Sequence, residues 1–246
     1  MENKSEIQPE IIHGDTQAQS ATVFGLTYLL GIELQPRIRN IKDLIFYRPD
    51  KKKNYKHIDA LFTESINWEL IETHWQDLMQ VVISIKAGKI LPSTLLRKLG
   101  NYSRKNRLYF AYRELGRVVR TIFLLKYISN QELREKIHAN TNKVESFHKL
   151  AKWLNFGGEI LQENDPEQQE KLIKYNNLVA NALIFQNVID QTRIIKALMD
   201  HGFPVIAEDL KTLSPYLTAH IKRFGDYVVD LNEVPPPLDI EYTFSI

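Results

Sequence analysis

The stretch that decides the fold is IHGDTQAQSATVFGLTYLLG, residues 12–31. An apolar run leads into a Gly14-Asp15 turn, and a small polar segment then precedes a second apolar run that ends at Gly31. We predict a short strand over residues 7–14 and a buried helix over residues 20–30 that Gly31 closes. Asp15 follows the strand and precedes the helix, so it is either a helix cap or part of a chemical site.

The composition is that of an ordinary globular protein, with 43% hydrophobic and 25% charged residues in 246. No apolar run reaches the ~18 residues needed to cross a bilayer, and the polar, acidic N-terminus does not resemble a secretory signal. The absence of cysteine excludes disulfides and cysteine-based zinc sites. These features predict a cytoplasmic protein with no membrane partner.

Charge is distributed unevenly, although the net charge is only +2. Residues 37–56 hold eight Lys or Arg and two Asp, and residues 97–126 hold nine Lys or Arg and one Glu. From Asp226 onward the chain carries five acidic residues and no basic one. Two basic segments beside an acidic tail suggest a polyanion partner, whereas the alternative is a solvated helix face and an ordinary tail.

The order of the predicted elements is lopsided. Residues 34–48 are predicted to be extended, and from residue 63 onward the pattern is almost all helical. The predicted helices cover residues 66–88, 91–128 with a break near Gly100, 129–139 with Ser129 as N-cap, 141–156 stopped by Gly157-Gly158, and 165–202 with Asp165, Pro166 and Gly202 as end signals. Because two strands alone do not form a stable sheet, either more strands lie outside this sequence or the strands pack unusually on helices.

The predicted helix at 141–156 has a polar stripe with Glu145, Lys149 and Lys152. The opposite face carries core-like spacing, formed by Val144, Phe147, Leu150, Ala151 and Leu154. Glu145 and Lys149 could be a plain surface pair, worth about 0.3–0.5 kcal/mol. Alternatively, a carboxylate on this helix and another at a strand end could share divalent metal ions and cleave a phosphodiester.

Other chemistries find little support in the sequence. There is no HExxH, no GxxxxGK[ST] or GxGxxG loop, and no GxSxG elbow. His148 lies beside the polar stripe and is a candidate metal ligand, but a histidine on a helix surface is more often a solvent-exposed residue that binds no metal.

Several longer stretches carry a resemblance to a known family. They are IHGDTQAQSATVFGLTYLLGIELQPRIRNIKDLIFYRPD, GRVVRTIFLLKYI, TNKVESFHKLAKWLNFGGE, NDPEQQEKLIKYNNLVANALIFQNVID and LSPYLTAHIKRFGDYVVDL. In this order, over about residues 10–232, they resemble the C-terminal catalytic part of Tn-three family transposases, the DDE enzymes of class II replicative transposons.

The resemblance implies an α/β, RNase H-like fold with a helical insertion, of which this chain holds mostly α-helix and a small remnant of the sheet. It implies that Asp15 matches the second catalytic aspartate and Glu145 the catalytic glutamate, and that both ligate Mg²⁺, for which Mn²⁺ can substitute. The candidate phosphate contacts are Arg37, Arg39, Arg104, Lys105, Arg107, Lys143, Lys149 and Lys152.

The resemblance also divides the chain. Residues 1–50 would be a partial RNase H-like core, 51–138 the insertion, 139–202 the catalytic-glutamate helix and a long packing helix, and 203–246 a C-terminal helical segment with an acidic, proline-rich tail. The family's first catalytic aspartate has no match here, which predicts a C-terminal fragment that is inactive alone.

The expected function is DNA transposition, in which transposon 3′ ends are cleaved and transferred to target DNA. The expected partners are transposon-end and target DNA, the missing N-terminal part, and further copies of the enzyme, with association to the nucleoid on DNA. The alternative is a non-catalytic DNA-binding or oligomerisation remnant of a truncated gene.

Overall fold

The computed structural model describes residues 9–91, 93–95, 107–155, 164–226, 228 and 230–232. The chain forms two compact units, Met1–Asn142 and Lys143–Ile246. Helix α6 (Gln131–Leu154) runs through the boundary between them. Within the described ranges, no helix combines the length and the apolar character that a membrane span requires.

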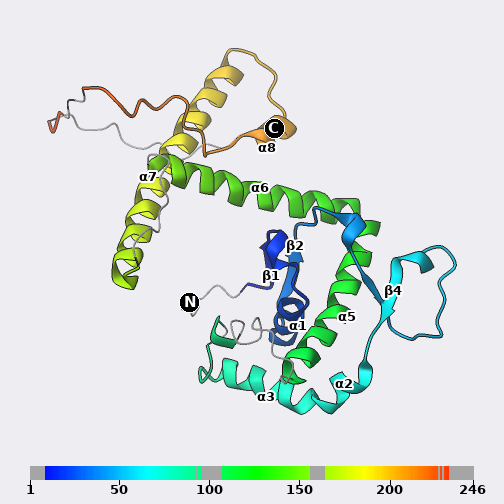
Figure 1. The fold of residues 1–246 in the computed structure, drawn as a ribbon. Helices are drawn as coiled ribbons and strands as arrows, with labels where there is room; N and C mark the ends of the chain where they lie inside the picture. Colours follow the sequence, from blue (N-terminus) through cyan, green and yellow to red (C-terminus); the bar gives the residue numbers. More distant parts are fainter. Residues whose placement is uncertain are drawn as a thin grey trace. The chain divides into compact units, whose positions relative to one another are not determined.

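The first unit begins with a β–α–β arrangement (Figure 1). Strand β1 (Ile11–Gly14) pairs in parallel with β2 (Glu33–Pro36), with Ile11 opposite Glu33 and Gly14 opposite Pro36. The short 3-10 helix η1 (Thr16–Gln19) and helix α1 (Ala21–Leu30) connect them. The helix predicted at 20–30 is confirmed, as is its end at Gly31, which has a φ of 82°.

A second parallel pair follows. Strand β3 (Phe46–Arg48) pairs with β4 (Phe62–Ser65), and the 3-10 helices η2 (Ile41–Asp43) and η3 (Asp59–Leu61) precede them. The prediction that residues from 63 onward are helical is therefore wrong for β4. The ladder between β3 and β4 is a long-range interaction that the local pattern of residues 63–65 does not encode.

The helix predicted over 66–88 is two helices, α2 (Trp68–Thr73) and α3 (Trp75–Lys86), with the break at His74. The side chain of Asn67 caps α2 by accepting a bond from the Leu70 N–H at 3.0 Å. Gly88 has a φ of 69° just after α3, as expected of a helix end. Helix α5 (Arg107–Ser129) follows, and the predicted break at Gly100 lies outside the described residues.

The centre of the first unit is the contact between α1 and α5, which lie side by side in Figure 1. A Cβ on Gly25 would lie 2.6 Å from the Tyr112 carbonyl oxygen, and a Cβ on Gly116 would lie 1.5 Å from that of Ala21. The two backbones can approach this closely only because both positions are glycine. One apolar cluster around Leu78 and Tyr112, and a second around Phe24 and Leu124, pack against this helix pair.

Tyr112 is fully buried on α5, and its hydroxyl donates to the Leu78 carbonyl oxygen at 3.2 Å. Burial raises the pKa of Tyr112 to about 12, because the phenolate would be desolvated. The folded protein therefore keeps the phenol neutral at pH values where the unfolded chain ionises, near pH 10.

This shift predicts a loss of stability at alkaline pH. The contribution of Tyr112 is complete below about pH 10 and is lost as the pH rises towards about 12, by about 2–3 kcal/mol in all. Urea unfolding of the wild type and of Tyr112→Phe between pH 8 and 12 measures it, because the difference between the two proteins removes other titrations. A constant difference over this range would contradict the assignment.

Helix α6 is continuous where two helices, 129–139 and 141–156, were predicted. The buried Thr141, predicted to start a new helix, lies inside α6, and its hydroxyl donates to the Ile137 carbonyl one turn earlier at 2.9 Å. Ser129 as the N-cap is also wrong. Asn130 accepts from the Leu133 N–H at 2.9 Å, while the Ser129 hydroxyl bonds carbonyl groups of α5.

The second unit contains the C-terminal part of α6, the long α7 (Pro166–Asp200) and the short α8 (Ala207–Thr212). Asp165 caps α7 through the Glu167 N–H at 3.0 Å, and Gly202 follows its end with a φ of 80°, as predicted. The C-terminal helical segment predicted from residue 203 is limited, in the described residues, to α8.

The segment at 213–224 is held by side-chain bonds to backbone carbonyls instead of by helix formation. Asn187 of α7 donates to the Pro215 and Leu217 carbonyls at 2.7 and 2.9 Å. Arg223 donates to the Trp153 carbonyl at 2.6 Å and stacks 4.6 Å from the centre of its indole. The proline-rich tail lies outside the described residues.

Candidate functional site

Asp15 lies at the carboxyl end of β1, on an exposed turn into η1. Its backbone carbonyl accepts a bond from the Ala18 N–H at 3.2 Å. A Cβ on Gly14 would lie 2.5 Å from that of Ala18, so this tight turn requires glycine before Asp15. Ser20 is the residue that precedes α1, so Asp15 is not the cap of that helix.

His13, which no sequence pattern singles out, is connected to α6 in the structure. Asn140 Nδ2 donates to His13 Nε2 at 2.9 Å, across 127 residues of chain. Burial lowers the pKa of His13, the Gln35 backbone opposes this, and the positive charge of Lys136 lowers the pKa further. A neutral imidazole suits the acceptor role at Nε2. The end of β1, two residues before Asp15, is thereby tied to α6.

This bond predicts a measurable coupling between strand and helix. His13→Ala and Asn140→Ala should each destabilise the protein, and the double variant should lose less than the sum by about 0.5–1.5 kcal/mol. Chemical denaturation of the four proteins completes the cycle. As a control, Asn140→Ala paired with Thr192→Ala on α7 should show additive effects. An additive His13–Asn140 pair would mean that the bond contributes nothing.

Glu145 lies half-buried on α6, in the second unit. Lys143, Lys149, Lys152 and His148 are exposed on the same helix. Leu150 and Ala151 are buried, as predicted for the core face, but Val144 is 52% exposed, and its assignment to the core is wrong. Phe147 and Leu154 are half-buried, and the Phe147 ring packs edge-on against Tyr216 with the ring centres 6.3 Å apart.

Two of the predicted basic residues adjoin the Asp15 turn or follow β2. Arg37 is half-buried; its N–H donates to the Gly14 carbonyl at 2.9 Å, and its own carbonyl accepts from Gln19 Nε2 at 3.0 Å. Arg39 is exposed and lines a shallow hollow of about 380 Å³ with Lys42. Arg107 is exposed at the start of α5, whereas Arg104 and Lys105 lie outside the described residues.

Carboxylate oxygens are the donors that Mg²⁺ prefers, so Asp15 and Glu145 are suitable in type. Asp15 belongs to the first unit and Glu145 to the second. Among the described residues, no three His, Cys, Asp or Glu side chains gather into a group that could hold a metal ion.

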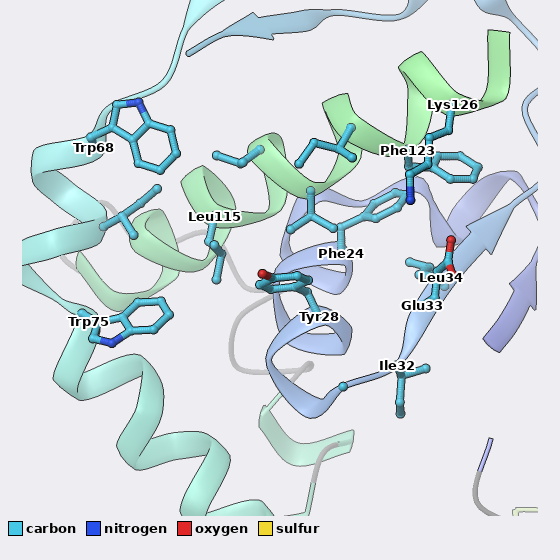
Figure 2. A pocket seen from close by; sticks show the side chains of 15 residues that line it. Phe24, Tyr28, Ile32, Glu33, Leu34, Trp68, Trp75, Leu115, Phe123 and Lys126 are labelled. Carbon is cyan, nitrogen blue, oxygen red and sulfur yellow. The ribbon is translucent and has the colours of Figure 1, made fainter. Parts of the chain in front are cut away.

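The first unit also contains an apolar groove of about 610 Å³, bordered by α1, β2, α2, α3 and α5 (Figure 2). Trp68, Trp75 and Tyr28 extend into it, and the Trp68 indole is held by a 2.8 Å bond to the Pro49 carbonyl. Its charged lining residues are Glu33 and Lys126, and Asp15 is not among the residues that border it. Among the described residues that line the groove, Glu33 is the one carboxylate, so they do not supply the several carboxylates that two-metal phosphodiester chemistry uses.

Comparison with known proteins gives the class of the chain. The family model described as the Tn3 transposase DDE domain matches residues 1–227. The transposase for transposon Tn501 of Pseudomonas aeruginosa is 37% identical over 228 residues, which is 92% of this chain and 23% of that protein. The transposases for Tn21 of Escherichia coli and Tn1546 of Enterococcus faecium are 36% and 34% identical.

The chain therefore belongs to the family of Tn3 transposase DDE domains. It spans about a quarter of the length of these curated relatives.

Proposed function

We propose that this chain is the C-terminal catalytic part of a DDE transposase, with an RNase H-like core that carries Asp15 and Glu145. The family match over residues 1–227 is the observation that carries the proposal. The complete enzyme would cleave the 3′ ends of its transposon with water and then join each 3′-hydroxyl to target DNA.

The parallel β1–α1–β2 arrangement supports an RNase H-like core. Parallel strands are normally buried on both faces within larger sheets. Ile11 and Ile12 of β1 are 36% and 37% exposed, so β1 has the sequence of an interior strand without full cover in the described residues. Further strands, supplied by the rest of a longer transposase, would bury these side chains. Residues 1–50 and 139–202 would then form the core, 51–138 the insertion and 203–246 a C-terminal extension.

In the proposed mechanism, Asp15 and Glu145 would hold divalent cations together with an aspartate from the remainder of the enzyme. Bound Mg²⁺ would supply Lewis acidity for attack on phosphorus, and Mn²⁺ could replace it. Asp15 is presented at the end of β1 by the tight Gly14 turn. Within the first unit, the His13–Asn140 bond holds the end of this strand against the first part of α6.

The basic side chains would position DNA through its phosphates. Arg37 and Arg39 in the first unit, with Lys143, Lys149 and Lys152 on α6, are the proposed contacts, together with Arg104, Lys105 and Arg107. The partners would be transposon ends, target DNA, the N-terminal part and further copies of the transposase.

One observation favours a second function, that of a non-catalytic DNA-binding or oligomerisation remnant. The described residues contain no group of three potential metal ligands. Two carboxylates would bind the cations weakly and leave the attacking oxygen poorly placed.

A chimera distinguishes the two functions. The part of the Tn501 transposase that lies outside the match would be fused to this chain, and cleavage of a labelled Tn501-end duplex would be measured with Mg²⁺ or Mn²⁺. We expect cleavage by the chimera and none by the 246-residue chain alone. A chimera that folds and binds the ends without cleaving them would favour the remnant.

A further inference from the structure

Helix α5 contains Arg107 at its first position and three further arginines, Arg113, Arg117 and Arg120, of which Arg117 has carboxylate partners. Arg117 Nη1 pairs with the buried Glu114 at 2.6 Å, its Nη2 lies 3.6 Å from Glu64, and its guanidinium stacks 4.5 Å from the centre of the Tyr47 ring. Its charge is therefore neutralised within the first unit.

Among the residues that the structure describes, no carboxylate pairs with Arg113 or Arg120. Both Nε atoms are buried without a hydrogen-bond acceptor, and neither side chain has an ion pair in the part of the chain that the structure describes. Arg113 is held over Phe110, 4.9 Å from the ring centre. Burial lowers the pKa of Arg120, and the electrostatic interaction with Tyr47 partly offsets this by raising the pKa.

These two side chains lie on the same face of α5, because Arg113 is three residues before Gly116 and Arg120 is four residues after it. Gly116 is the point where α5 touches Ala21, in the first turn of α1. The pair therefore flanks the start of α1, six residues after Asp15 and in the same unit as Arg37.

A buried guanidinium N–H without an acceptor is unfavourable, because the group has lost its hydrogen bonds to water. Two such groups on one helix face make the two guanidinium groups candidates for an anionic acceptor that the described residues do not supply. Arginine presents a planar fork that suits phosphate oxygens, and stacking on Phe110 holds the fork of Arg113 in place before a ligand arrives.

We propose that Arg113 and Arg120 form a binding site for backbone phosphates of DNA beside the first turn of α1. This inference rests on the proposed function, since it takes the polyanion to be the DNA on which a transposase acts. The count of basic residues in 97–126 suggested DNA binding by the whole segment. The proposed site assigns the main contacts to Arg113 and Arg120, whose Nε–H groups have no acceptor among the described residues. A carboxylate of a protein partner could also accept hydrogen bonds from these arginines, and the test below distinguishes it from a DNA phosphate.

The test measures binding of the full chain to a mixed-sequence duplex of about 20 base pairs, by fluorescence anisotropy between 50 and 200 mM salt. The double variant Arg113→Gln/Arg120→Gln should bind roughly 10–100-fold more weakly at 100 mM salt, with a log–log salt slope smaller by about 1.8. The matched control is Arg193→Gln on α7, an exposed residue 4.0 Å from Asp190, which should bind like the wild type.

A second variant keeps the test informative if the glutamine protein fails to fold. Arg113→Lys/Arg120→Lys retains both charges and the apolar stems but loses the forks, so it should bind several-fold more weakly with a nearly unchanged salt slope. Thermal unfolding checks that each variant is folded.

The outcomes separate the two proposals. If the wild type binds and both double variants bind equally well, the Arg113–Arg120 site is wrong, a protein carboxylate becomes the better acceptor, and DNA binding by the chain stands. If the folded wild type does not bind duplex DNA at 50 mM salt, the DNA-binding part of the proposed function fails, and the site fails with it.

Discussion

In the Tn501 chimera, Asp15→Ala and Glu145→Ala are each expected to abolish both strand cleavage and strand joining, with losses of at least about 10²-fold and values at the detection limit. Each change removes one carboxylate from a site that needs several to hold its cations. It also displaces the attacking oxygen, and a displacement of about 1 Å already costs roughly 10²-fold in rate. Gel analysis of a labelled duplex measures each step separately.

The control shows whether the loss is chemical. Glu167→Ala removes an exposed carboxylate that pairs with Lys171 on α7, and it should leave the rate unchanged. Both catalytic variants should still bind the duplex, because alanine removes negative charge beside a polyanion. Retained cleavage by the Glu145 variant would show that this glutamate is a surface residue, and that its pair with Lys149 was the better interpretation.

The local signals of the sequence predicted helix ends well. Gly31 and Gly202 adopt positive φ after α1 and α7, and Asp165 caps α7 directly before Pro166. Each of these is a property of a few neighbouring residues, so a single sequence contains it.

Features that depend on distant residues were not predictable. Strand β4 exists because it pairs with β3, and the α2 N-terminus is fixed partly by the buried Glu114, which accepts from the Asn67 N–H at 3.3 Å across 47 residues. Counting charges could not show that Glu114 pairs with Arg117, or that no carboxylate in the described part of the chain pairs with Arg113 or Arg120.

The candidate site divides in the same way. The roles of Asp15 and Glu145 follow from the family resemblance, and they stay predictions. The turn at Gly14 was predictable from the Gly-Asp pair itself. The His13–Asn140 bond was not predictable, because the residues around His13 contain no signal that points to Asn140.

The second large effect is expected at Gly116, where α5 touches α1. Helix propensity alone predicts that Gly116→Ala stabilises the protein by about 1 kcal/mol, because alanine is the better helix former. The structure predicts the opposite sign. The new Cβ would lie 1.5 Å from the Ala21 carbonyl oxygen, and this atom is backbone, which cannot turn aside as a side chain can. The helices must separate, and we expect a loss of at least about 3 kcal/mol in the free energy of unfolding.

Gly31→Ala is the matched comparison, because no atom lies within 4 Å of a Cβ there and its φ is +82°. Strain alone should cost about 1 kcal/mol at Gly31. Urea unfolding of both variants therefore compares a clash with a strained backbone in one protein. Because separation of α1 from α5 would also move the Arg113–Arg120 pair away from the first turn of α1, any Gly116→Ala protein that folds should bind DNA more weakly, whereas Gly31→Ala should not. If Gly116→Ala is instead as stable as the wild type, the close approach of the two helices is wrong, and with it the placement of the arginine pair.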